Sequence, residues 1–142
     1  MTMTVKPAKP NIQRLILGGL AAGLLINTVE YLVHRVLLDS QWTAAFAALG
    51  KTPKGWTSII PSNFVVGTIG IWIYAKFLPN YGPGHKTALR GALIIWVVFW
   101  AIPMMALLPL DIFPNFLLFA TIAVGLLDSI LAVLLGAWIY RQ

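Results

Sequence analysis

Residues 15–38 read LILGGLAAGLLINTVEYLVHRVLL, an apolar run long enough to cross a membrane as one helix. A hydrocarbon core of about 30 Å requires about 20 helical residues. Three polar residues, Asn27, Glu30 and His34, stand inside this run, and hydropathy alone does not explain them. Together with Asp128 in a later apolar run, they are the strongest indication of function in the chain.

Three further apolar runs predict spans at residues 57–78, 87–108 and 115–140. The 142 residues are 59% hydrophobic and only 10% charged, with a mean hydropathy of +0.85. Soluble domains carry about 25% charged residues, so this composition indicates an integral membrane protein. We therefore predict an all-α polytopic membrane protein, with four transmembrane helices in one bundle domain (1–142) and a cytoplasmic N-terminal tail (1–13).

The segments between the spans also carry structural signals. Residues 40–49 have apolar side chains at helical spacing, which predicts a short helix lying on the membrane surface. Two prolines and two glycines in residues 79–86 predict tight turns and no continuing helix. The gap at 109–114 predicts a close hairpin, with Asp111 as the cap of the last helix. Pro103 is expected to kink the third span.

The cations lie mainly in the gaps between spans, and the formal net charge is +6. With four spans, the termini and the second gap share one side. That side collects Lys6, Lys9, Arg14, Lys76, Lys86, Arg90 and Arg141, against Arg35, Lys51 and Lys54 on the other. The positive-inside rule then predicts cytoplasmic termini. The chain has no nucleic-acid-binding motif, so its charge indicates topology and not a nucleic-acid partner.

Aromatic residues near the span ends suggest interfacial belts. These are Trp72, Tyr74, Trp138 and Tyr140 on the inner side and Trp42 and Trp56 on the outer side. The inner set belongs to two similar endings, GIWIYAK (70–76) and GAWIYR (136–141). They indicate either two tandem helical hairpins or only the preference of any helix that ends at the inner surface for aromatic residues followed by a cation.

Five residues of the first span share one helical face: Gly19, Gly23, Asn27, Glu30 and His34. A second face, in the fourth span, holds Thr121, Gly125, Asp128, Ala132 and Gly136. Small residues let helices approach closely, so we expect these two faces to meet. Asn27 and Asp128 lie roughly 20 and 18 Å from the cytoplasmic ends, at 1.5 Å per residue, and Pro103 falls in the same layer.

The polar positions allow two interpretations. Asp128 either hydrogen-bonds Asn27 or a backbone carbonyl and holds the bundle in register, or it belongs to a ligand or proton site. Glu30 and His34 lie nearer the outer surface, where they can pair across one helical turn. His34 is most simply an interface residue, although haem or chlorophyll ligation by it stays open. The sequence contains no cysteine and predicts no metal site and no catalytic residue, and the cofactor is unknown.

The run 15–50, the segment YGPGHKTAL (81–89) and the ending GAWIY (136–140) resemble a group of uncharacterised bacterial small four-helix membrane proteins. Asn27, Glu30 and Trp42 match the polar end of the first helix in that group. The resemblance implies bacterial origin and placement in the inner membrane. It implies no activity.

The sequence favours a non-enzymatic accessory or interaction subunit, a homo-oligomer or part of a larger membrane complex, with Trp96 and Trp100 as a possible outer contact. One alternative is an oligomeric proton-linked or lipophilic-substrate transporter that uses Asp128 and Glu30 and needs a hydrated cavity reaching Asp128. A second is a pigment- or lipid-binding protein, which needs a deep pocket ending at Glu30 or His34.

Overall fold

The computed structural model describes residues 9–55 and 57–141, and the regular structure in these ranges is entirely helical. Four helical stretches are long and apolar enough to cross a membrane: Ile12–Leu37, Ile59–Tyr81, His85–Leu110 and Asn115–Arg141. The prediction of an all-α protein with four spans is therefore confirmed. The predicted belt residue Trp56, the cation Lys6 and the first eight residues of the predicted tail lie outside the described residues.

Two of the four spans change helix type along their length. The first consists of α1 (Ile12–Glu30) and a π-helical segment η1 (Tyr31–Leu37). The third consists of α4 (His85–Trp96), a π-helical segment η2 (Val97–Ala101), α5 (Ile102–Leu107) and a 3-10 turn η3 (Leu108–Leu110). The other elements are α3 (Ile59–Tyr81), α6 (Asn115–Arg141) and the short helix α2 (Asp39–Ala48).

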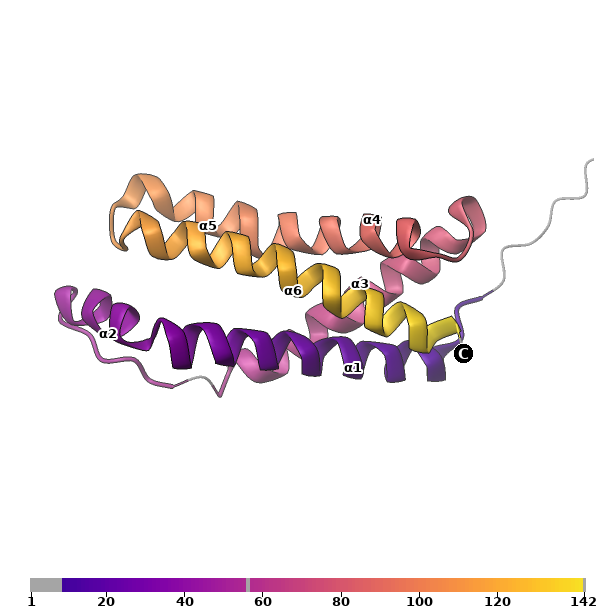
Figure 1. Ribbon diagram of the computed structural model, residues 1–142, viewed down its shortest axis with the longest axis horizontal. Coiled ribbons are helices and arrows are strands. Elements are labelled where there is room, and N and C mark those ends of the chain that lie inside the picture. Colours follow the sequence, from indigo (N-terminus) through magenta and orange to yellow (C-terminus); the bar gives the residue numbers. More distant parts are fainter. Residues whose placement is uncertain (1–8, 56, 142) are drawn as a thin grey trace, which may run out of the picture.

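Helices α3 and α6 form the centre of the bundle, and α1 and α4 each pack on both of them (Figure 1). The two ends of the described chain meet at one end of the bundle. There the backbone N–H of Asn11 donates to the Tyr140 hydroxyl over 3.1 Å, and Arg14 donates to the Arg141 carbonyl over 3.4 Å. Helix α2 and the link between α5 and α6 lie at the opposite end (Figure 1).

Glycines allow α1 to approach both central helices. A Cβ atom added to Gly67 of α3 would lie 2.9 Å from the Gly19 carbonyl oxygen, so Gly19 and Gly23 face α3 and not α6 as expected. Gly18 is the residue that meets α6, because a Cβ atom added to it would lie 2.6 Å from the Gly136 carbonyl oxygen. The glycines of the two predicted faces therefore do not meet one another.

Equivalent positions in the two helical hairpins make equivalent contacts. The approach of Gly18 to Gly136 has a looser counterpart in the approach of Gly91 to Gly70, where a Cβ atom would lie 3.4 Å from the carbonyl oxygen. The rings of Tyr74 and Tyr140 touch edge to face, with centroids 6.0 Å apart. Both tyrosines are buried, so neither belongs to the predicted aromatic belt, whereas Trp72 and Trp138 are exposed.

The structure corrects two predictions at the helix ends. Helix α3 continues through Pro79 to Tyr81, although the proline cannot donate the usual backbone hydrogen bond, and it ends at Gly82, whose φ is 70°. Asp111 does not cap the last helix. It adopts a left-handed conformation (φ 49°) that ends η3, and α6 begins later, at Asn115.

Pro103 lies at the junction between two helix types, and the kink expected there stays a prediction. It occupies the first turn of α5, where its missing N–H is not needed, and η2 precedes it. The N–H of Ile102 bonds the carbonyl of Val97, five residues earlier, which is the π-helical pattern. The third span therefore accommodates its proline by widening the turn before it.

Replacing Gly67 with Val tests the contact between α1 and α3. The added side chain must displace backbone atoms of Gly19 and Gly23, so we expect a loss of about 1–3 kcal/mol in the free energy of unfolding. Unfolding by sodium dodecyl sulfate in mixed micelles measures it. The control is Ala123→Val on the exposed side of α6. Equal stability of the two variants would show that the glycine contact is not needed.

Candidate functional site

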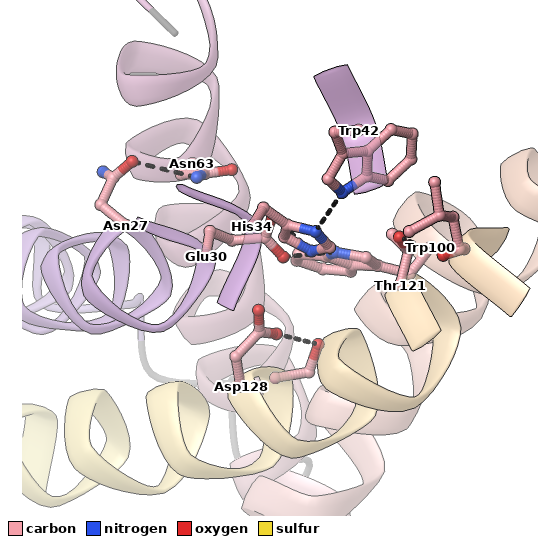
Figure 2. Close-up of polar contacts among 10 residues, drawn as sticks. Asn27, Glu30, His34, Trp42, Asn63, Trp100, Thr121 and Asp128 are labelled. Carbon is pink, nitrogen blue, oxygen red and sulfur yellow. Dashed lines mark hydrogen bonds and ion pairs between the residues drawn. The ribbon is translucent and has the colours of Figure 1, made fainter. Parts of the chain in front are cut away.

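Four polar or aromatic side chains from three spans meet around Glu30 inside the bundle. Glu30 is 8% exposed, His34 2%, Trp100 7% and Asp128 0%. They come from α1 with η1, from η2 and from α6 (Figure 2). His34 is thus a buried residue and not the interface residue expected from its position near the end of the span.

Glu30 is held by two nitrogen atoms. The indole N–H of Trp100 donates to Oε1 over 3.1 Å, and Nε2 of His34 lies 3.5 Å from Oε2. The pairing of Glu30 with His34 across one helical turn is as the sequence predicts. Trp100 was instead expected to face outward, and this expectation is wrong.

The indole nitrogen of Trp42 determines which ring nitrogen of His34 carries a proton. The indole N–H of Trp42, which belongs to α2, donates to Nδ1 of His34 over 3.0 Å (Figure 2). An indole nitrogen can only donate, so Nδ1 must accept and carries no proton. The proton of a neutral imidazole is then on Nε2, the nitrogen that faces Glu30. Trp42 is therefore a hydrogen-bond donor to the buried cluster, and its place in an outer aromatic belt stays a prediction.

Asp128 brings a second carboxyl group against Glu30. Its Oδ1 accepts from the Ser129 hydroxyl over 3.4 Å, and its carboxyl group interacts with that of Glu30. Its Oδ2 is buried and has no hydrogen-bond partner among the described residues. Asp128 therefore adds a second buried acidic side chain to the cluster around Glu30.

Asn27 does not join Asp128, although the two residues were expected to share a layer. Its Oδ1 accepts from the Asn63 side chain over 3.0 Å, and its Nδ2 donates to the Ile60 carbonyl over 3.2 Å. Figure 2 shows this amide pair on a different side of Glu30 from Asp128. Asn27 thus links α1 to α3, and Glu30, not Asn27, is the residue of the first span that interacts with Asp128.

The two π-helical segments coincide with the cluster. Segment η1 starts directly after Glu30 and contains His34, and η2 contains Trp100. π-Helical turns are rare and are found frequently at functional sites. The turn at η2 also separates Trp100 from Trp96, whose indole N–H donates elsewhere, to the Ile122 carbonyl over 2.9 Å. The outer contact predicted for this tryptophan pair therefore does not exist.

A pocket of about 460 Å³ opens beside His34 at the α2 end of the bundle. Its walls come from η1, α2, residues 51–55 and the start of α3. Trp42 and Phe46 supply aromatic surface, and Phe113 packs behind both rings, with centroids 5.7 and 5.5 Å away. One wall of the pocket is therefore formed by a member of the buried cluster.

The cluster does not suit a metal. Among the described residues, no group of three or more His, Cys, Asp and Glu side chains could hold a metal ion. Both ring nitrogens of His34 already face Trp42 or Glu30, so the metal of a haem or chlorophyll would have to displace one of them. Ligation of such a pigment by His34, left open by the sequence, does not fit this geometry.

Comparison with models of protein families, with curated proteins and with solved structures finds no match for this chain. The function is therefore argued from the site itself.

Replacing Trp100 with Phe keeps an aromatic ring but removes the donor to Glu30. A buried carboxyl oxygen without its partner should lower the free energy of unfolding by about 1–3 kcal/mol. Trp138→Phe is the matched control, because Trp138 is exposed. Detergent-induced unfolding of both variants gives the comparison, and a Trp100→Phe protein as stable as the control would argue against a stabilising bond.

The state of His34 can be read by nitrogen NMR on protein labelled with ¹⁵N-histidine. We expect Nδ1 without a proton and Nε2 with one, because Trp42 donates to Nδ1. Trp42→Phe should change the His34 signals and leave those of the exposed His85 unchanged. A doubly protonated ring in the unmodified protein at neutral pH would contradict the hydrogen-bond assignment.

Proposed function

We propose that this protein is a non-enzymatic, multi-pass membrane protein that binds a lipophilic ligand at the α2 end of its bundle. One observation carries the proposal: His34 of the buried cluster lines the pocket formed by η1, α2, residues 51–55 and the start of α3. A lipid-binding function requires a pocket of this kind beside the polar residues.

The size and lining of the pocket support this function. Ligand sites usually enclose about 300–1,000 Å³ and combine apolar walls with a few placed polar groups. Here the volume is about 460 Å³, and Trp42 and Phe46 supply the apolar walls. His34 supplies a polar edge that is connected, through Glu30, to the interior of the bundle. A ligand that displaces Trp42 would therefore alter the whole cluster.

The other two functions receive less support from the site. Proton-linked transport requires water to reach Asp128, yet Asp128 is fully enclosed. It lines neither the pocket at His34 nor a smaller hollow of about 170 Å³ that Glu30 lines. An accessory subunit requires free contact faces, whereas Gly19, Gly23 and Trp100 pack inside the chain. Oligomerisation and a larger complex remain predictions.

The charges support an orientation in which both termini are cytoplasmic and the pocket opens on the opposite side. The end of the bundle that holds the termini carries Lys9, Arg14, Lys76, Lys86, Arg90 and Arg141 among the described residues. The pocket end carries Arg35, Lys51 and Lys54. The positive-inside rule assigns the first end to the cytoplasm, and the resemblance to bacterial proteins supports the inner membrane.

Photolabelling tests the proposed site. A neutral photoreactive fatty alcohol, added to the protein in lipid nanodiscs, should label peptides containing residues 42–59, as read by mass spectrometry. Thr43→Trp fills the pocket and should remove most of this labelling. Ala47→Trp places the same side chain on an exposed position of α2 outside the pocket and should not. Equal labelling of both variants would contradict the proposal.

A further inference from the structure

We propose that the ligand is a single-chain amphiphile with an acidic headgroup, which binds Lys51 and Lys54 while its alkyl chain runs past Ile59 into a second hollow between α1 and α3. This inference rests on the proposed function, because it takes the pocket at His34 as the ligand site. It adds the chemical class of the ligand and the path of its chain.

The charges around the pocket favour an anionic ligand. Arg35 and Asp39 both line it and form an ion pair of 2.7 Å, so their charges largely compensate. Lys51 and Lys54 line the same pocket, and within the described part of the chain neither forms an ion pair with a carboxylate. Two ammonium groups at the mouth of an apolar pocket therefore attract an acidic headgroup and disfavour a cationic one.

A second hollow shares one lining residue with the pocket at His34. It encloses about 170 Å³ and is lined by Leu24, Tyr31 and Phe64, with Glu30 and the Asn27–Asn63 pair beside them. Ile59, the first residue of α3, lines both spaces. A chain that enters from the headgroup pocket therefore has to pass one isoleucine side chain to reach the second space.

The second hollow suits an alkyl chain despite its two asparagines. Asn27 accepts from Asn63 and donates to the Ile60 carbonyl, so these amide groups are engaged with protein. Leu24, Tyr31 and Ile60 are exposed on the outer surface of the bundle, which places the hollow beside the lipid in a membrane. The hollow is small, which favours one chain and not the two chains of a phospholipid.

The length of the path also fits one extended chain. The two spaces lie along α1 and η1 from Leu24 to Arg35, which is roughly 16 Å at 1.5 Å per residue. The headgroup position at Lys51 and Lys54 marks one end of this path, and Leu24 marks the other. A dodecyl chain with an acidic group is therefore a suitable probe.

Two photoreactive probes test the proposal, a dodecyl sulfonate and a dodecyl trimethylammonium, each with a diazirine at the chain end. Both keep their charge at every pH used, and the protein is held in nanodiscs of zwitterionic lipid. We expect the sulfonate to label peptides containing Leu24 and Phe64 and to be competed by unlabelled dodecyl sulfonate. The trimethylammonium probe should label them at least about tenfold less, because an ammonium group about 4 Å from a unit charge in water changes binding by about a factor of five, in opposite directions for the two probes.

Two sets of variants separate the headgroup from the chain path. Lys51→Glu with Lys54→Glu should reverse the preference between the two probes, and neither residue is buried, so folding is preserved. Ile59→Trp should move the label from Leu24 and Phe64 to peptides of the headgroup pocket. Val65→Trp is the matched control on α3, since Val65 is exposed and lines neither space.

The outcomes distinguish this inference from the proposed function. Labelling spread evenly over the lipid-facing helices, or equal labelling by both probes, would overturn the anionic class and the chain path. If the neutral fatty alcohol still labels residues 42–59, the proposed function stands and only this inference fails. If none of the probes labels the pocket, both fail.

Discussion

A carboxyl group inside an apolar bundle must receive its hydrogen bonds from the protein, and Glu30 imposes this requirement on three of the four spans. Water is absent from the hydrocarbon core, so an unpartnered acid there is costly. Trp100 from the third span donates a hydrogen bond to Glu30, Nε2 of His34 from its own span lies 3.5 Å from its carboxylate, and Asp128 from the fourth span interacts with it. The geometry of the site follows from satisfying this one side chain.

Glycines provide the space that this arrangement of helices and side chains requires. Trp100 can turn inward because Gly125 of α6 leaves room for its ring, and any side chain at Gly125 would overlap the indole. Gly18 and Gly136 hold α1 close to α6, which brings Glu30 within reach of Asp128. Packing by small residues and the polar cluster are therefore two aspects of the same helix contacts.

Hydropathy was sufficient for the four spans, because twenty apolar residues have few other stable environments. The pairing of Glu30 with His34 also followed from sequence, since it depends only on the four-residue spacing within one helix. The partner of Asp128 could not be predicted from the sequence. Counting residues gives depth along a helix, and it put Asn27 level with Asp128, but the rotation of each helix decides which residues meet.

Other parts of the site depend on features without a sequence signature. The inward turn of Trp100 follows from the π-helical segment at Val97–Ala101, which α-helical periodicity does not reveal. Trp42 resembled an ordinary interfacial tryptophan, because its bond to His34 exists only once α2 folds back on the bundle. The pocket needs residues 51–55, which have no periodic pattern at all.

The bond from Trp42 to His34 also connects a helix outside the four spans to the charge inside them. Any displacement that lifts α2 from the bundle withdraws an N–H from the nitrogen at which imidazole takes its second proton. The position of α2 and the hydrogen bonding of a buried histidine are therefore coupled. A movement of α2 would change the contacts of the ring that lies beside Glu30.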